Sequence, residues 1–284
     1  MNTIEMVKKM SAEKDTLVCV GLDPDIKYMP HEFTSAIDIS KPGSAEDATF
    51  GFLREVIDIT QEYACAFKLQ KAFYDRYERG TSLLSRTVSY IKKTNPDMPA
   101  IVDAKIGDIS NTFGAYMELL FEDMHADGVV VNPYMGDDIF EFALKYPEKA
   151  FVVLVRTSND GAGIVQDAEL ASGKRLWEYI LSLSCGRWNE KGNLIVVMSS
   201  RLSADYTKIR KSIPDQMPIL VVGMGVQKGS IDAVRQLLNS EKAGLLINSS
   251  RAILYPYSQD DKEWRGKIRK SAMHFREEIN TARR

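Results

Sequence analysis

The sequence holds few of the residues on which disulfides and metal sites depend, with only three cysteines and three histidines among 284 residues. Cys19, Cys65 and Cys185 stand in apolar or mixed sequence without a CxxC spacing, and an odd number cannot pair completely. We therefore expect reduced core thiols. The histidines are scattered in polar sequence without a zinc-type pair, which predicts solvated positions and no bound metal.

The chain also lacks long apolar runs and an excess of charge of one sign. No stretch approaches the ~18 consecutive apolar residues that cross a membrane, and the N-terminus has no apolar signal segment. A net charge of −2 provides no basic field for nucleic acid. These absences exclude membrane-spanning and nucleic-acid-binding classes and favour a cytoplasmic protein. The 44% of hydrophobic residues are enough to bury a sizeable core.

Short apolar runs recur along the chain, and they are continuous rather than alternating, which is typical of strands buried on both faces. The runs are 16–22, 64–69, 99–103, 127–131, 150–155, 194–198, 218–222 and 243–247. Helical stretches separate them, and one carries an apolar stripe expected to be core: Phe113, Tyr116, Met117, Leu120, Phe121 and Met124. Eight alternating β and α units predict a single (β/α)8 TIM barrel domain over 1–284, with a doubly wound open sheet as the alternative.

Charged residues gather where the second and third runs end. The third run closes on Asp103-Ala-Lys105-Ile-Gly-Asp108, and the second on Phe67-Lys68. Asp103 and Lys105 share one face because successive strand side chains alternate. Taken singly, each charge has a structural explanation, such as helix capping by Asp108 or a path to water for Lys68. Buried ion pairs stabilise a fold poorly, so their joint occurrence predicts a functional site.

Glycines and an arginine follow the last two runs. Gly223, Gly225 and Gly229 come after the seventh run, and Arg251 comes after the eighth. Glycines let backbone N–H groups approach an oxyanion closely, and a guanidinium forks onto phosphate. Barrels commonly bind phosphate in these two loops. We therefore predict a phosphate-binding loop here, with a glycine-rich turn beside a surface arginine as the alternative.

Together these residues resemble the orotidine 5′-phosphate decarboxylase family over almost the whole chain. The family pattern Asp-x-Lys-x-x-Asp-Ile stands at 103–109, with Phe67-Lys68 and Gly21-Leu-Asp23 on the preceding runs. Matches typical of the longer bacterial branch are Asn132-Pro-Tyr134, Thr157-Ser-Asn159, Gly225-Val-Gln227 and Ser249-Ser-Arg251-Ala252. Departures from the pattern are Val131, Met198-Ser-Ser200 and Lys228.

The resemblance implies a cofactor-independent carboxy-lyase that converts orotidine 5′-phosphate into uridine 5′-phosphate and CO2, the last step of de novo UMP synthesis. It implies a homodimer whose catalytic array is Lys68, Asp103, Lys105 and Asp108, with Asp108 crossing from the partner subunit. Lys105 would stay protonated between carboxylates, stabilise the carbanion at C6 and protonate it. The implied substrate contacts are Asp23 on the ribose, Asp108 and Thr112 on the ribose across the interface, Ser158 on the pyrimidine, and Gln227 and Arg251 on the phosphate.

Two other functions have to be weighed against this one. Sugar-phosphate decarboxylases and hexulose-phosphate synthases share the barrel and the Asp-x-Lys-x-x-Asp pattern, but use Mg²⁺ held partly by a glutamate where this chain has Lys68. An ammonium at that position repels a dication. A non-catalytic sensor of nucleotide phosphates is the other alternative, and such a binder has no need for a buried charged array.

Overall fold

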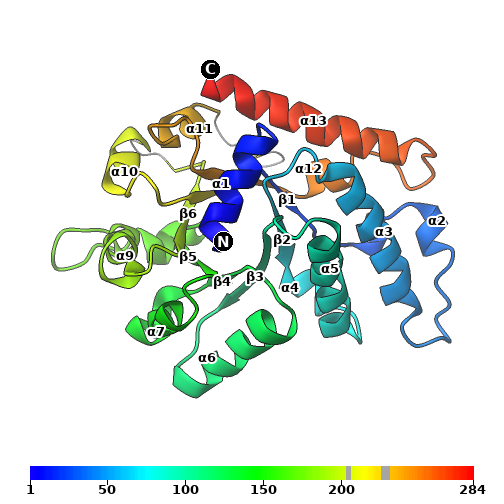
Figure 1. The fold of residues 1–284 in the computed structure, drawn as a ribbon, viewed down its shortest axis with the longest axis horizontal. Helices are drawn as coiled ribbons and strands as arrows, with labels where there is room; N and C mark the ends of the chain where they lie inside the picture. The colour runs from blue at the N-terminus through cyan, green and yellow to red at the C-terminus, as the bar shows by residue number, and fades with distance from the viewer. Residues whose placement is uncertain (203–205, 225–230) are drawn as a thin grey trace.

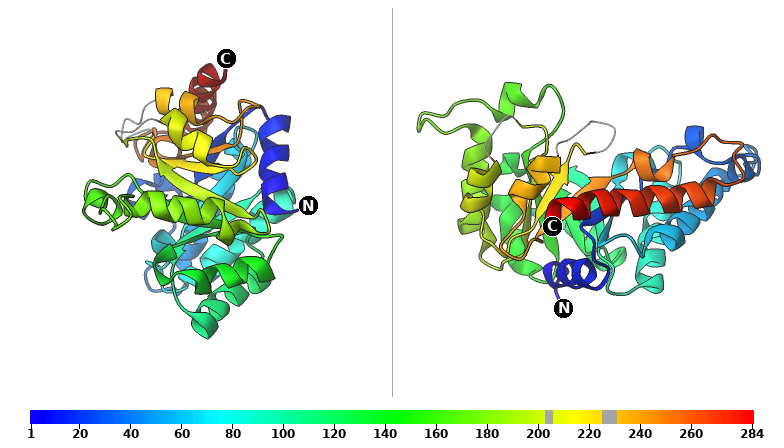
Figure 2. Two further views of the ribbon diagram at one scale, coloured as in Figure 1. Left: turned by 90° about the vertical axis from the view of Figure 1, so that its left-hand side faces the viewer. Right: turned by 90° about the horizontal axis from the view of Figure 1, so that it is seen from above.

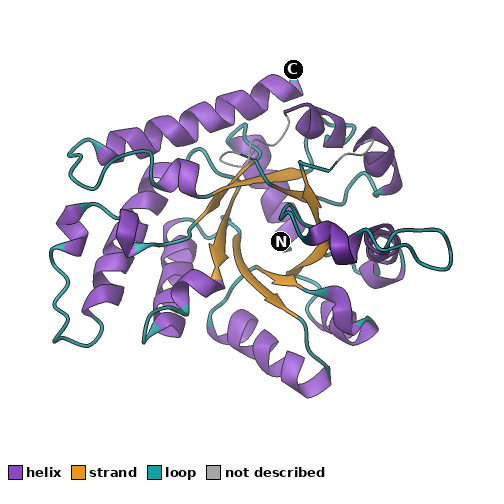
Figure 3. Cartoon of the chain, turned by 180° about the vertical axis from the view of Figure 1, so that it is seen from behind, coloured by secondary structure: helices purple, strands orange, loops and turns teal. Residues whose placement is uncertain are grey.

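Eight parallel strands form a closed barrel in this computed structural model, which describes residues 1–202, 206–224 and 231–284. The strands pair in chain order and β8 closes onto β1. Figure 3 shows the strands in the centre of the molecule with the helices around them. They are β1 (Val18–Gly21), β2 (Ala66–Gln70), β3 (Ala100–Ile106), β4 (Gly128–Val131), β5 (Ala150–Arg156), β6 (Leu194–Ser199), β7 (Ile219–Val222) and β8 (Leu245–Ser249). The predicted barrel is confirmed, and the open-sheet alternative is wrong because the sheet has no free edge.

Burial on both faces explains the continuous apolar runs. In β6, Leu194, Val196 and Met198 pack outward against the helices, whereas Ile195 and Val197 point into the barrel. Both sets are almost fully buried. A strand inside a barrel wall therefore needs apolar side chains at every position except where its end reaches the site.

Helices surround the barrel (Figure 1). The α-helices are α1 (Thr3–Glu13), α2 (His31–Thr34), α3 (Ser44–Thr60), α4 (Lys71–Tyr74), α5 (Gly80–Thr94), α6 (Ser110–Met117), α7 (Asp137–Lys145), α8 (Ala162–Gln166), α9 (Leu176–Cys185), α10 (Tyr206–Ser212), α11 (Ile231–Leu237), α12 (Arg251–Leu254) and α13 (Trp264–Arg283). Short 3-10 turns are η1 (Ile26–Tyr28), η3 (Pro133–Met135) and η4 (Arg187–Asn189), and η2 (Glu118–Asp123) is a π-helix. Within the described ranges, no helix is long and apolar enough to cross a membrane.

The first helix closes one end of the barrel. Helix α1 crosses the barrel end that faces the viewer in Figure 1, and Figure 2 shows it apart from the long outer helix α13. Ile4 and Val7 join the apolar cluster inside the barrel, and Thr3 Oγ1 donates to the Asp127 carbonyl at 2.6 Å. This end is the N-terminal end of the strands, so we expect a ligand to enter at the opposite end.

The helical stripe after β3 is mostly core, as predicted. Phe113, Met117, Leu120, Phe121 and Met124 are buried. Tyr116 is 38% exposed, so the prediction of a core position is wrong for it. It lies at the edge of the stripe, where α6 gives way to the π-helical turn η2.

Candidate active site

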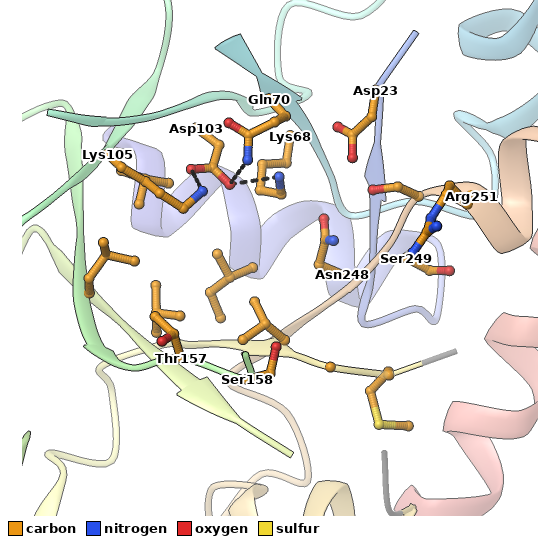
Figure 4. Close-up of a pocket in the computed structure, with 18 of the residues that line it drawn as sticks. Asp23, Lys68, Gln70, Asp103, Lys105, Thr157, Ser158, Asn248, Ser249 and Arg251 are labelled. Atoms are coloured by element: carbon orange, nitrogen blue, oxygen red, sulfur yellow. Dashed lines mark hydrogen bonds and ion pairs between the residues drawn. The ribbon is translucent and has the colours of Figure 1, made fainter. Parts of the chain in front are cut away.

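A cavity of about 280 Å³ opens at the C-terminal ends of the strands. The charged part of its wall comes from β2, β3 and the loop after β1: Asp23, Lys68, Asp103 and Lys105. The apolar part comes from β4 to β7: Val130, Leu154, Val197, Leu220 and Val222. Polar residues of the loop after β5 and of the end of β8, among them Ser158 and Asn248, line the rest. Figure 4 shows the charged side chains grouped on one side of the pocket. A polar ligand held against the apolar part is shielded from water, which strengthens its electrostatic contacts.

Asp103 joins the two lysines on neighbouring strands. Its Oδ2 lies 2.8 Å from Lys68 Nζ, and its Oδ1 lies 2.6 Å from Lys105 Nζ (Figure 4). The Lys68 and Asp103 side chains are 5% and 9% exposed, whereas Lys105 is 44% exposed toward the open end. The array thus has a buried base of two charges and a third, the Lys105 ammonium, that a ligand can reach.

The charges of this array stabilise one another. Burial alone would lower the pKa of Lys68, but the carboxylates of Asp23 and Asp103 outweigh it and raise that pKa above its ordinary value. Burial likewise works against an ionised Asp103, yet Lys68 and Lys105 lower its pKa. Both Lys68 and Asp103 are therefore charged at neutral pH.

The backbone of β3 is irregular at Lys105. The residue has a φ of +50°, and the register against β4 shifts between Val102 and Ile106. A left-handed conformation at a residue with a side chain costs about 1–3 kcal/mol and is commonly found at functional sites. The strand continues beyond the predicted run to Ile106, so Asp103 and Lys105 belong to the strand itself and share its inner face.

Several predicted binding residues lie at the same pocket. Asp23, Ser158, Gly223 and Arg251 all line it, and Arg251 lies at the opposite end from Lys105 in Figure 4. Asp23 Oδ1 is buried and has no hydrogen-bond partner among the described residues, so it can accept from a ligand hydroxyl. Gly223 has a φ of +92°, and a Cβ there would lie 3.0 Å from Ser158 Cβ. Only glycine lets the β7 end approach Ser158 this closely.

Other predicted residues do not meet at this pocket. Asp108 and Thr112 are not part of its wall; Asp108 is half-buried and Thr112 is exposed. Asp108 Oδ1 accepts from the Ile109 N–H at 2.8 Å, and no ion pair joins Asp108 to Lys105 in the described part of the chain. The predictions for Gly225, Gln227 and Gly229, and the departure at Lys228, lie outside the described residues.

Gln70 and Asn248 are among the polar residues of the pocket that were not selected as site residues from the sequence. Gln70 Nε2 donates to Asp103 Oδ2 at 3.3 Å, and Asn248 lines the wall beside Asp23. Strand alternation offered a signal for Gln70, because it stands two residues after Lys68 and shares its face. The apolar part of the wall was also missed, since a strand buried on both faces gives no sign of which apolar residues face a ligand.

Comparison with known proteins agrees with this geometry. The model of the Orotidine 5'-phosphate decarboxylase / HUMPS family matches residues 16–263, which is most of the chain. The chain belongs to this family. The match spans β1 through β8 and so includes every strand end that contributes to the pocket.

Full-length relatives and solved structures carry the first of the two family names. The orotidine 5′-phosphate decarboxylase of Cupriavidus necator is 37% identical over 284 residues, covering 100% of this chain and 99% of the relative. That of Bordetella pertussis is 36% identical, covering 100% of both. The solved OMP decarboxylase of Leishmania donovani has a TM-score of 0.79 at 27% identity, covering 100% of this chain and 99% of the other. A putative orotidine-monophosphate decarboxylase from Toxoplasma gondii has a TM-score of 0.84 at 25% identity, covering 99% and 96%.

Proposed function

We propose that this chain is a single-domain, homodimeric carboxy-lyase that converts orotidine 5′-phosphate into uridine 5′-phosphate and CO2 in the cytoplasm. The observation that carries the proposal is the Lys68–Asp103–Lys105 array in the wall of the pocket, in a chain whose full-length relatives bear this name. The near-neutral charge supports a small-molecule substrate with no nucleic-acid or membrane partner.

The substrate would lie across the pocket from Arg251 to Lys105. Arg251 would bind the phosphate, Asp23 would accept from a ribose hydroxyl, and Ser158 would contact the pyrimidine. In this orientation, C6 of the pyrimidine would lie next to the Lys105 ammonium, in the charged part of the wall. The phosphate is remote from C6, so its binding energy would contribute to the transition state without touching the reacting bond.

Decarboxylation breaks the bond from C6 to the carboxylate carbon and leaves the electron pair on C6. The ammonium of Lys105 would stabilise this anion, which the pyrimidine delocalises poorly, and would then transfer its proton to C6. Asp103 fixes the ammonium at 2.6 Å before the substrate arrives, so little reorganisation is needed during the reaction. Preorganised charge of this kind commonly supplies the largest part of an enzyme's rate acceleration.

The proposal includes a partner subunit that completes each site with Asp108 and Thr112. Both residues follow β3 but stay outside their own pocket. Large apolar side chains close to them in the sequence are exposed: Ile109 is 53% and Tyr116 is 38% exposed, and in the loop after β4 Tyr134 is 82% and Met135 is 44% exposed. Exposed large apolar side chains such as these support an interface with a partner subunit in the loops after β3 and β4.

The magnesium-dependent sugar-phosphate enzymes remain the alternative, since the matched family description covers two groups. Lys68 supports the decarboxylase: its ammonium is buried beside Asp103, where it would repel a dication. In the described part of the chain, no three His, Cys, Asp or Glu side chains are grouped as metal ligands.

Incubation with orotidine 5′-phosphate tests the proposal directly. The pyrimidine absorbance should fall as the conjugated carboxylate is lost, with one CO2 released per UMP formed. Substrate that binds without turnover would favour the sensor, and activity on sugar phosphates that depends on added Mg²⁺ would favour the alternative enzymes.

A further inference from the structure

A bidentate ion pair between an arginine and an aspartate, here called the fork, joins the two ends of the loop after β5. Arg156, the last residue of β5, donates from Nε to Asp167 Oδ1 at 3.1 Å and from Nη2 to Oδ2 at 2.8 Å. Asp167 directly follows helix α8. The two side chains are only 11% and 29% exposed, and paired bonds of this kind also fix the orientation of both groups.

A second set of bonds holds the backbone next to Ser158. Gln166 Oε1 accepts from the Thr157 N–H at 2.9 Å, and its Nε2 donates to Thr157 Oγ1 at 2.8 Å. Arg156 Nη1 donates to the Thr157 carbonyl at 2.7 Å. Both backbone polar groups of Thr157 are thus occupied by side chains from the two ends of the loop, which restricts the peptide that leads into Ser158.

The packing at Gly163 shows how closely the fork fits. A Cβ at this position would lie 2.9 Å from Asp167 Oδ2 and 3.8 Å from Arg156 Nη2. Even a methyl group would have to displace the Asp167 carboxylate. The chain therefore offers a way to disturb the fork without removing either of its charges.

We propose that Arg156, Gln166 and Asp167 are positioning residues that hold Ser158 in place for the pyrimidine of the substrate. The proposal rests on the proposed function, because that function assigns the pyrimidine contact to Ser158. None of the three touches the reacting bond; each acts through Thr157 and Ser158. Their effect should therefore fall on ligands that contain a pyrimidine and spare those that lack one.

The test compares binding of UMP and ribose 5-phosphate by isothermal titration calorimetry. Asp167→Ala and Gly163→Ala should each weaken UMP binding about 10-fold, the value of roughly one hydrogen bond, and leave ribose 5-phosphate unchanged. In a Ser158→Ala background, Asp167→Ala should weaken UMP binding little further, because both changes remove the same contact with the pyrimidine. Asp47→Ala is the matched control, since it removes a carboxylate 2.8 Å from Arg86 on the exposed surface.

The outcomes separate this proposal from the one that it rests on. Equal weakening of both ligands, no weakening of UMP, or additive effects with Ser158→Ala would overturn the positioning role. If Asp167→Ala fails to fold, Gly163→Ala decides, since it keeps every partner in the chain. A wild-type protein that neither binds UMP nor decarboxylates orotidine 5′-phosphate would refute the proposed function itself, whatever the variants do.

Discussion

Replacing Asp103 by asparagine should destabilise the protein strongly, because two ammonium groups depend on this carboxylate. Lys68 Nζ lies 2.8 Å from Oδ2 with its side chain 5% exposed, and Lys105 Nζ lies 2.6 Å from Oδ1. Breaking a buried pair by removing one partner costs about 3–5 kcal/mol, since the other charge stays buried. Asp23 still acts on Lys68, and Lys105 can be hydrated at the pocket rim, so we expect the lower end, about 3 kcal/mol.

Thermal unfolding followed by circular dichroism measures this loss. A destabilisation of about 3 kcal/mol should lower the Tm by roughly 6–12 °C for a chain of this size. The pKa of Asp103 is lowered, so its contribution is present above about pH 4 and is lost as the pH falls through the folded-state value. The pKa of Lys68 is raised, so its contribution is present below about pH 10 and is lost as the pH rises through the folded-state value. Neutral pH lies inside this window.

Two further variants make the measurement decisive. Asp47→Asn removes the charge from a surface pair whose side chains are 71% and 40% exposed, and it should change stability by less than about 1 kcal/mol. Lys68→Met with Asp103→Leu removes both buried charges and should cost less than Asp103→Asn alone. If the Asp103→Asn variant has the same Tm as the Asp47→Asn variant and the wild type, the reasoning about buried charge is refuted.

The remaining predictions concern the partner subunit, metals and thiols. Mixing inactive Lys105→Ala with inactive Asp108→Ala should restore about a quarter of wild-type activity, because half the dimers are mixed and each has one intact site; a mixture as inactive as its components would contradict the shared site. EDTA should leave decarboxylation unchanged, whereas loss of activity restored by Mg²⁺ would favour the sugar-phosphate enzymes. Burial raises the pKa of Cys65 to about 12 and that of Cys185 to about 11, so native protein should react with Ellman's reagent at pH 8 far more slowly than unfolded protein; fast labelling before unfolding would show that these thiols are accessible.

The barrel was predictable because its strands are buried on both faces. All eight apolar runs correspond to strands, since inner and outer positions are filled alike, as in β6. Charges at the end of such a run are conspicuous for the same reason, which made Lys68, Asp103 and Lys105 easy to select. The free state of the cysteines followed equally from their number and spacing.

Features that depend on tertiary contacts were not predictable. The left-handed backbone at Lys105 arises where β3 shifts register against β4, and no residue type in this segment predicts it. The contact between Arg156 and Asp167 that joins the two ends of the β5 loop depends on the path of that loop, which no sequence pattern indicated. Helix α1 covers the barrel end through Ile4 and Val7, although its sequence shows only an amphipathic, charged segment.

The most direct test of the central claim compares Lys105→Ala with wild type on orotidine 5′-phosphate, with UMP binding and Tm measured on the same samples. The account predicts that wild type decarboxylates the substrate, and that the variant loses turnover while it keeps its fold and binds UMP. Within the Lys68–Asp103–Lys105 array, only the Lys105 ammonium is exposed to a ligand, so Lys68 cannot donate the proton in its place. Near-normal decarboxylation by the Lys105→Ala protein would contradict the account.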